Sequence, residues 1–494
     1  MIQGFEWYIP PSSSSSPSQS HWHRLTKLLP SLAKIGITKM WIPPACKAAD
    51  GPNGNGYDIY DLWDLGEFPQ KGSTPTKWGS KSQLELLSKT AEGHGVKIIF
   101  DAVLNHKAGG DFKERVKAKK VDPLDRNIEL DNGMVREIES WTGFNFSARG
   151  EKYSRMEWNK RHFTGVDWDD IGREKGIWKV GGKEWCGDVD EEVGNYDFLM
   201  FADVDHRHPE VQRDIFDWIE WLPTQIKIGG LRLDAIKHYS FQFQKRLLGH
   251  IDTNVENGKD WFIVGEYWRE DSEFLARYIE YMEHRMALFD VPLCSNFSRI
   301  SLAGEKGDLR QVFDDTLCLW KPNNVVTSVA PWFLPHAYAL ILLRANAGLP
   351  CVFYSDLYGS FASGPSSFIP PMSENTILLP RLILLRKLYA YGTQHDYFCE
   401  TGCIGFTREG HPSQSGGAGL AVVMTNQWRW STQRMFVGKQ HSGEKWIDVL
   451  GLCPGKVVID EEGWGEFNVS GNRGCSVWVD EKADGRLEVS RLEL

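Results

Sequence analysis

The stretch Gly230-Leu231-Arg232-Leu233-Asp234-Ala235-Ile236-Lys237-His238 joins a short, mostly apolar run to charged residues at its C-terminal end. Two other stretches have the same form: Ile98-Ile99-Phe100-Asp101-Ala102-Val103-Leu104-Asn105-His106 and Phe262-Ile263-Val264-Gly265-Glu266-Tyr267-Trp268. A run of this length predicts a buried strand of a parallel sheet. Polar residues where such strands end predict a site at the carboxyl edge of that sheet.

Similar runs recur through the first 392 residues and alternate with amphipathic, helix-like stretches. Eight of them are candidate strands: Ile2–Trp7, Ile37–Ile42, Val96–Val103, Gly230–Asp234, Phe262–Tyr267, Leu288–Val291, Val325–Val329 and Cys351–Tyr354. This alternation predicts an α/β fold, either a closed (β/α)8 TIM barrel or an open, doubly wound sheet. Eight strands favour the barrel, which we assign to residues 1–106 and 207–392.

Two segments fall outside this alternation. Residues 107–206 follow the third strand and are too long for a structureless loop, so they predict an inserted domain. Residues 393–494 consist of short apolar runs separated by Gly and Asn, which predict a C-terminal antiparallel β-sandwich. Its candidate strands are Cys403–Arg408, Leu420–Thr425, Met435–Gly438, Trp446–Val449, Val457–Ile459, Gly465–Val469 and Ser476–Val479.

Composition narrows the classes of partner. The chain carries 56 Lys+Arg against 66 Asp+Glu, a net charge of −10, and so lacks the basic footprint of a nucleic-acid binder. Its longest apolar run, Ala337–Leu343, is far shorter than the ~20 residues of a membrane span. No basic, apolar leader opens the sequence, and nine cysteines without a CxxC pair indicate free thiols. We therefore expect a cytoplasmic protein with neither nucleic-acid nor membrane partners.

Three charged residues at the strand ends indicate the chemistry. Arg232 and Asp234 lie two apart and therefore share one face of their strand, here the barrel interior. Glu266 ends the next strand, and neighbouring strands lie ~4.8 Å apart, so the two carboxylates can approach the ~5–5.5 Å separation of retaining glycosidases. In that case Asp234 attacks the anomeric carbon, Glu266 acts as acid and base, and Arg232 keeps Asp234 ionised. The alternative is a buried ion pair that only stabilises the barrel.

Several motifs together resemble the α-amylases of glycoside hydrolase family 13, particularly the bacterial liquefying and fungal intracellular type. They are Gly56-Tyr-Asp-Ile-Tyr-Asp61, Asp101-Ala-Val-Leu-Asn-His106, Gly194-Asn-Tyr-Asp197, Phe201-Ala-Asp-Val-Asp205, Gly230-Leu-Arg-Leu-Asp-Ala-Ile-Lys-His238, Gly265-Glu-Tyr-Trp268 and Gln394-His-Asp-Tyr-Phe398. The resemblance implies the same barrel, insertion and C-terminal domain, with Asp234 as nucleophile and Glu266 as acid/base. It also implies a glucan-binding set made of Tyr57, Asp101, His106, Arg232, Lys237 and His238, in which Tyr57 stacks on a sugar.

The resemblance further implies one structural calcium ion between the barrel and the inserted domain. Its ligands match Asn105, Asp197, Asp203 and the backbone carbonyl of His238, and oxygen ligands of this kind suit Ca²⁺. From spacing alone, the acidic residues of 197–205 read as a solvated loop. Relatives that hold a second metal have acids where this chain has Thr164 and Cys186, so we expect a single ion.

One family motif is absent. Members carry Asn-His-Asp after the seventh strand, and its Asp is a third carboxylate of the site. Here the chain reads Lys321-Pro-Asn-Asn-Val-Val-Thr-Ser-Val-Ala-Pro-Trp-Phe333, and Asn-His-Asp occurs nowhere in the sequence. Asp356, at the end of the eighth strand, is the nearest substitute, although the family already has an acid there.

Three explanations of this gap remain open: a segment dropped from the gene model, a pseudoenzyme that still binds α-glucan, or an enzyme of weak activity. The leading hypothesis from the sequence is a retaining α-1,4-glucan hydrolase, endo-acting on starch, glycogen or maltooligosaccharides and able to transglycosylate. Its activity would be impaired by the gap. The alternative is a catalytically inactive α-glucan-binding pseudoenzyme.

Overall fold

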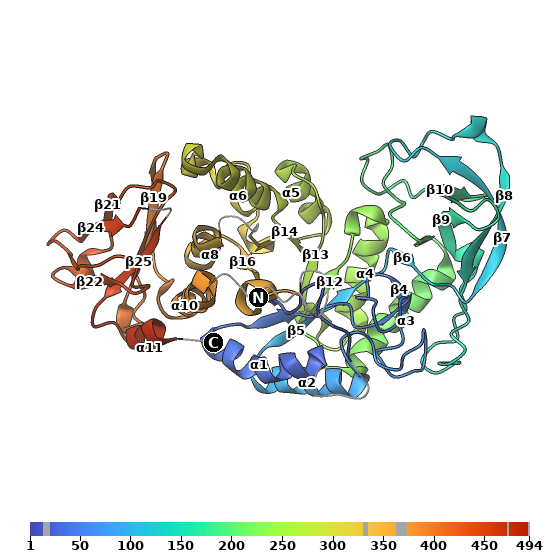
Figure 1. Ribbon diagram of the computed structural model, residues 1–494, viewed down its shortest axis with the longest axis horizontal. Coiled ribbons are helices and arrows are strands. Elements are labelled where there is room, and N and C mark those ends of the chain that lie inside the picture. The colour runs from blue at the N-terminus through green and yellow to red at the C-terminus, as the bar shows by residue number, and fades with distance from the viewer. Residues whose placement is uncertain (13–19, 330–333, 362–372, 472–473, 493–494) are drawn as a thin grey trace.

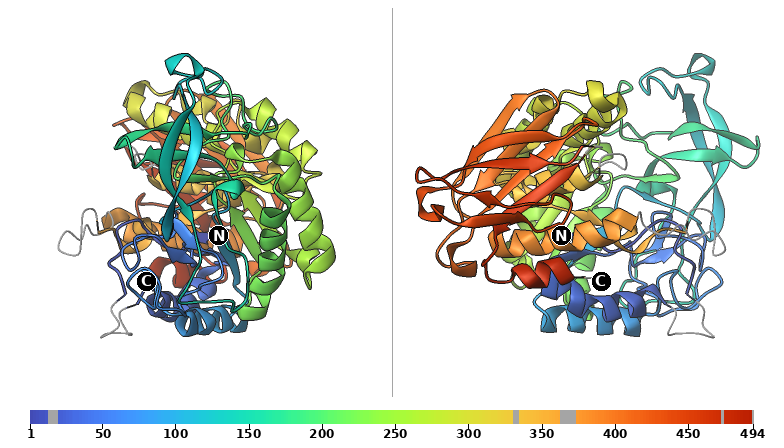
Figure 2. Two further views of the ribbon diagram at one scale, coloured as in Figure 1. Left: turned by 90° about the vertical axis from the view of Figure 1, so that its right-hand side faces the viewer. Right: turned by 60° about the vertical axis from the view of Figure 1, so that its left-hand side comes forward.

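A computed structural model describes residues 1–12, 20–329, 334–361, 373–471 and 474–492. Its centre is a parallel β-barrel, with the inserted domain at one end of the long axis and the C-terminal domain at the other (Figures 1 and 2). Among the described residues, no helix is long and apolar enough to cross a membrane.

The barrel sheet has the strand order β16-β15-β14-β13-β12-β5-β2-β1-β17. Its strands, all paired in parallel, are β1 (Ile2–Gln3), β2 (Lys39–Trp41), β5 (Lys97–Ala102), β12 (Gly230–Leu233), β13 (Phe262–Gly265), β14 (Ala287–Phe289), β15 (Val325–Thr327), β16 (Leu349–Pro350) and β17 (Val352–Phe353). β17 lies within the predicted strand Cys351–Tyr354, and β16 directly precedes it: β16 pairs with β15 and β17 with β1. That shared segment closes the barrel, so the predicted TIM-barrel class is confirmed.

Helices surround this barrel, as its alternating pattern requires (Figure 1). They are α1 (His21–Ile35), α2 (Lys81–Gly93), α3 (Pro209–Gln225), α4 (Phe241–Asn254), α5 (Ser272–Tyr281), α6 (Val291–Ala303), α7 (Leu317–Trp320), α8 (Leu334–Leu343), α9 (Tyr354–Tyr358) and α10 (Ser373–Tyr389). Val291, expected to end the sixth strand, instead begins α6. The reason is local: the Asp290 side chain accepts a hydrogen bond from the Leu293 amide and caps the helix, while Pro292 occupies its first turn.

The inserted domain is a six-stranded sheet in the order β6-β11-β9-β10-β7-β8. Its strands are β6 (His106–Lys107), β7 (Phe112–Val121), β8 (Arg136–Gly143), β9 (Phe163–Asp169), β10 (Glu174–Val180) and β11 (Ala202–Val204). β6 follows closely after barrel strand β5, and β11 returns the chain toward α3. A site built from both ends of this insertion therefore lies beside the barrel mouth.

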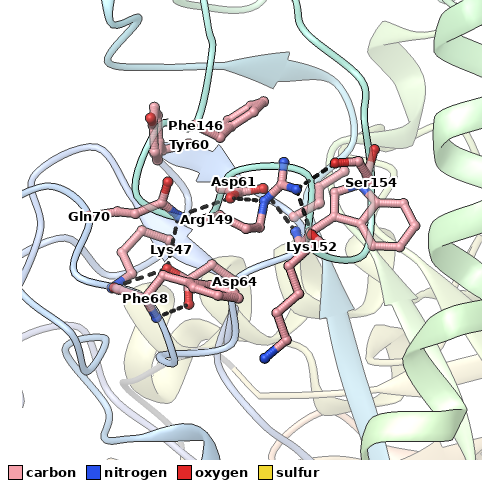
Figure 3. A network of polar contacts seen from close by, with 12 residues as sticks. Lys47, Tyr60, Asp61, Asp64, Phe68, Gln70, Phe146, Arg149, Lys152 and Ser154 are labelled. Carbon is pink, nitrogen blue, oxygen red and sulfur yellow. Dashed lines mark hydrogen bonds and ion pairs between the residues drawn. The ribbon is translucent and has the colours of Figure 1, made fainter.

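A buried ion pair ties the inserted domain to strand β4 (Ile59–Asp61), which follows β2 (Figure 3). Arg149 donates from Nε to Asp61 at 2.8 Å and from Nη1 to the carbonyls of Lys152 and Ser154, while the side chains of Arg149 and Asp61 are almost wholly buried. Lys47 donates to Asp64 and to three backbone carbonyls in the same network. The Arg149–Asp61 pair therefore fixes the insertion against the barrel side, and Lys47 stabilises the segment that carries Asp61.

Arg149→Met is therefore expected to lower the free energy of unfolding by about 3–5 kcal/mol, since removing one partner leaves Asp61 charged and buried. Denaturant titration measures this loss. Arg115→Met is the matched control, because Arg115 pairs with Glu137 at an exposed position and its loss is expected to cost under about 1 kcal/mol. Equal losses in the two variants would contradict the assigned role of the buried pair.

The C-terminal domain packs a six-stranded antiparallel sheet against a two-stranded one. The large sheet holds β18 (Gln394–Glu400), β19 (Cys403–Arg408), β20 (Leu420–Thr425), β25 (Cys475–Asp480), β22 (Lys445–Asp448) and β23 (Val457–Val458); the small one holds β21 (Ser431–Phe436) and β24 (Trp464–Val469). The predicted sandwich is confirmed. β18 was not among the predicted strands because polar side chains dominate it, and helix α11 (Arg486–Arg491) follows the last strand.

Candidate active site

Arg232 lies at the centre of the site predicted from the sequence. Its guanidinium bonds three carboxylates: Asp101 and Asp234 from Nη1 at 2.8 and 2.5 Å, and Glu266 from Nη2 at 2.7 Å. The register explains this arrangement, because Arg232 pairs directly with Asp101 on β5 while Leu233 pairs with Gly265 on β13. Asp234 and Glu266 then follow their strands side by side, as the sequence predicts.

Burial and like charge set the protonation of these carboxylates. Burial, reinforced by Glu266 and Asp101, raises the pKa of Asp234 to about 7 despite Arg232. Burial also pushes up the pKa of Glu266, but Arg232, the Trp268 indole and the Ala235 amide outweigh it and lower that pKa. Since one guanidinium faces three carboxylates, burial and mutual repulsion favour the retention of a proton within this group of carboxylates.

Asp101 is held from a second side. Its Oδ2 accepts hydrogen bonds from Trp41 Nε1 and from the Tyr57 hydroxyl, both at 2.9 Å. His106 in turn donates from Nε2 to the Tyr57 carbonyl at 2.7 Å, and burial lowers its pKa to about 4, so the imidazole is neutral at physiological pH. These contacts join Tyr57 and His106 to the cluster formed by Arg232 and its three carboxylate partners, Asp101, Asp234 and Glu266.

A cavity of about 400 Å³ opens over the cluster. Its lining is largely aromatic and aliphatic: Gln3, Phe5, Trp7, Trp41, Tyr57, His106, Leu199, Met200, Arg232, Asp234, Ala235, Glu266, Tyr267, Trp268, Phe289, Val291, Cys294, Ser328 and Phe353. Trp7 stacks on Tyr57 with centroids 5.2 Å apart, and Trp7 and Trp268 remain 52% and 59% exposed. No role for these two indoles was predicted from the sequence. Their positions just after β1 and β13 are the feature of the sequence that could have placed them in the site.

Lys237 and His238 lie beside the cavity and not in its lining. Lys237 donates to Glu192 of the inserted domain at 2.8 Å and to the Trp268 carbonyl at 2.9 Å. His238 donates from Nδ1 to the Tyr196 carbonyl at 2.8 Å. Both residues therefore join the barrel to the inserted domain.

The four predicted calcium ligands include buried oxygens that lack partners. Asn105 and Asp203 are at most 1% exposed, and the Oδ1 atom of each is buried without a hydrogen-bond donor. Burial and the neighbouring Asp197 raise the pKa of Asp203, and burial raises that of Asp197 to about 7. Such a set of buried, mutually repelling oxygens suits a hard cation.

The Thr164 and Cys186 positions offer donors where a second metal would need acceptors. Thr164 donates its hydroxyl to Asp203, and the Cys186 amide donates to Asp197 at 2.9 Å.

The end of β15 carries no acid in the described part of the chain. Ser328 lines the cavity there, with Cys294 Sγ 3.3 Å from its hydroxyl, and residues 330–333 lie outside the described residues. Asp356 accepts a hydrogen bond from Tyr338 at 2.5 Å and is not part of the lining. Among the described lining residues, the carboxylates are therefore Asp234 and Glu266.

A TIM barrel with two carboxylates at adjacent strand ends, beneath an aromatic-lined cavity, defines the class of glycoside hydrolases. The sequence matches the family model "Alpha amylase, catalytic domain" over residues 14–292 and the model "Alpha-amylase C-terminal" over residues 420–479. The chain therefore belongs to the alpha-amylase family, whose members are glycoside hydrolases that act on α-1,4-glucans.

Similar proteins cover nearly the whole chain. An alpha-amylase of Bacillus licheniformis is 40% identical over 97% of this chain and 93% of its own. The cytoplasmic alpha-amylase of Escherichia coli is 37% identical over 98% and 99%. The crystal structure of an alpha-amylase from Geobacillus thermoleovorans, complexed with acarbose, has the same fold with a TM-score of 0.60, at 18% identity over 93% of this chain and 92% of that one.

Proposed function

We propose that the protein is an endo-acting, retaining hydrolase of α-1,4-glucans such as starch, glycogen and maltooligosaccharides, able to transfer glucan to sugar acceptors. The observation that carries this proposal is the contact of Asp234 and Glu266 with a single guanidinium, that of Arg232. Adjacent carboxylates held in this way match the close spacing that retaining glycosidases require.

In the proposed reaction Asp234 attacks the anomeric carbon while Glu266 protonates the departing glycosidic oxygen. The glycosyl–Asp234 ester is then hydrolysed by water, or attacked by a sugar hydroxyl, with Glu266 taking the proton. This sequence requires Asp234 ionised and Glu266 protonated, whereas in the substrate-free cavity the pKa of Asp234 is raised and that of Glu266 is lowered. Bound sugar displaces water around Glu266 and offers hydroxyl donors to Asp234, which moves the shared proton to the acid.

The remaining predicted residues supply substrate contacts in this proposal. Arg232 and His106 line the cavity at the cleavage point, and Tyr57 with the exposed Trp7 offers a stacking surface. Asp101, predicted from the sequence as a sugar contact, lies beneath the lining with its side chain fully buried and acts by holding Arg232 and Tyr57. Lys237 and His238 act from the side where the inserted domain meets the barrel. Their contacts with Glu192 and Tyr196 support this placement.

Incubation of the chain with maltoheptaose, beside a Glu266→Gln control, tests the proposal. Shorter oligosaccharides formed with retained anomeric configuration, and not formed by the control, are the expected result. Product of inverted configuration, or equal product from both proteins, would refute the assigned roles.

A second candidate is a glucan-binding pseudoenzyme, favoured by the absence of Asn-His-Asp from the sequence. It predicts that maltoheptaose binds, as measured by calorimetry, with no turnover above the Glu266→Gln control. Absence of binding would eliminate it.

We also propose that Asn105, Asp197, Asp203 and the His238 carbonyl hold one structural Ca²⁺. The ion would neutralise the two buried carboxylates and join β6 and β11 to the barrel. Millimolar Ca²⁺ is then expected to raise the melting temperature by roughly 5 °C over EDTA, if it exceeds its Kd about 100-fold. Asp203→Asn should lose this response, and Asp125→Asn, a control outside the proposed ligand set, should retain it. An unchanged response in Asp203→Asn would contradict the ligand set.

A cytoplasmic location is proposed as well. All nine cysteines are free, including Cys186 and Cys475, which is typical of proteins that fold in a reducing compartment. The similarity to the cytoplasmic enzyme of Escherichia coli supports the same location.

A further inference from the structure

The residues after β13 contact two different surfaces in alternation. Glu266 and Trp268 meet each other in the cavity, where the Trp268 indole donates to Glu266 Oε1 at 2.9 Å. Tyr267 and Arg269 instead contact Asp190, which belongs to the loop between β10 and β11 of the inserted domain. The segment that carries the proposed acid/base is therefore held from outside the barrel.

Asp190 uses both of its carboxylate oxygens in these contacts. Oδ2 accepts from the Tyr267 hydroxyl at 2.6 Å and from Arg269 Nη1 at 3.0 Å, while Oδ1 accepts from the Glu192 amide at 2.8 Å. The Asp190 amide donates to the Lys237 carbonyl at 3.1 Å. Its side chain is fully buried, so it joins the ends of β12 and β13 to one loop of the inserted domain.

Trp268 is the residue held between these contacts. Its neighbours on both sides bind Asp190, and its own carbonyl accepts from Lys237, which Glu192 anchors from the same loop. Its indole is 59% exposed, so packing alone does not fix the ring. The polar contacts with the inserted domain fix its backbone and so aim its N–H at Glu266.

We propose that Asp190 is a positioning residue for the acid/base: it holds Tyr267 and Arg269 so that Trp268 keeps Glu266 oriented toward the glycosidic oxygen. The inference rests on the proposed role of Glu266. Other charged groups facing Glu266 are Arg232, which bonds it directly, and Asp234 and Asp101, which share that guanidinium. None of these contacts Asp190, so a variant at Asp190 acts on Glu266 through Trp268.

Leaving-group dependence tests this role, because acid assistance matters most when the leaving group is poor. Asp190→Ala is expected to lower kcat roughly 10- to 100-fold on an aryl maltotrioside with a poor leaving group, since small displacements of an acid are costly. On α-maltotriosyl fluoride, which needs little acid assistance, the loss should stay below about threefold. Arg269→Gln, which keeps the Tyr267 contact, should give a smaller loss of the same kind.

Glu210→Ala is the matched control, truncated to Ala because Gln could still accept a hydrogen bond from His162. It removes another contact between the barrel and the inserted domain, that of Glu210 on α3 with His162, without touching the acid/base segment. Equal losses of Asp190→Ala on both substrates, or no loss on either, would overturn the inference. If Glu266→Gln itself shows no leaving-group dependence, the proposed function fails and not the positioning role alone.

A second measurement requires no turnover. In protein labelled with ¹³C at the Glu carboxyl carbon, the Glu266 signal is identified by its loss in Glu266→Gln and titrated by NMR. The indole N–H stabilises the ionised form, so Asp190→Ala and Trp268→Phe are both expected to raise the pKa of Glu266. An unchanged pKa in Asp190→Ala, beside a raised one in Trp268→Phe, would overturn the proposal.

Discussion

Asp234→Asn is expected to lower kcat on maltoheptaose at least ~10⁴-fold, because an amide cannot form the glycosyl ester on which the two-step reaction depends. Binding should persist, since the cavity walls and Asp101 are unchanged and Arg232 keeps two of its three carboxylate partners. Initial rates measure the loss, and calorimetry with maltoheptaose measures the retained affinity. A loss of kcat below about tenfold would show that Asp234 is not the nucleophile.

The same substitution is expected to stabilise the protein at alkaline pH. The pKa of Asp234 rises from 3.8 to about 7 on folding, mainly through burial, so the ionised form is disfavoured in the native state. In the wild type, the contribution of Asp234 to the free energy of unfolding is then present below about pH 4 and is lost as the pH rises through about 7. Asn does not titrate, so the variant has no such pH dependence at this position. The variant should therefore melt higher at pH 8 than the wild type, relative to their difference at pH 4. A pH-independent difference would contradict this account.

Restoring the missing segment is expected to raise kcat about a thousandfold. The graft places a dozen or more residues ending in Asn-His-Asp after β15, ahead of helix α8, so that a third carboxylate reaches the cavity beside Ser328. Hydrogen bonds that strengthen in the oxocarbenium-like transition state contribute several kcal/mol, and ~4 kcal/mol corresponds to about a thousandfold in rate. Steady-state rates on maltoheptaose measure the gain.

The control graft carries Asn-His-Asn and differs only in that carboxylate. It should restore the loop but not the increase in kcat. Comparison of the two grafts therefore separates the effect of loop shape from that of the carboxylate charge. Equal gains in both would assign the effect to closure of the cavity. No gain in either, with wild-type activity already high, would mean that Asp234 and Glu266 suffice for this chain.

Much of this architecture was predictable because it is local. A short apolar run with a polar end specifies a buried strand and the face to which Asp234 and Glu266 belong. Each of the eight predicted barrel strands overlaps a strand of the structure, although β14 begins one residue earlier than predicted and β16 precedes the predicted last strand. The elements that the sequence analysis missed lack that local signal. β18 is polar and half-exposed, and the cap of Asp290 competes with the apolar pattern that placed Val291 in a strand.

Which groups meet depends on the packing of distant segments. The three-way contact of Arg232 depends on the register of β12 against β5 and β13, and Asp190 reaches Tyr267 across 77 residues of chain. The barrel, the insertion and the positions of the two carboxylates were predictable from the amino-acid sequence, since periodicity encodes which side of an element a residue faces. The sequence did not determine the partners, because contacts between distant segments depend on strand register, barrel closure and the packing of the inserted domain.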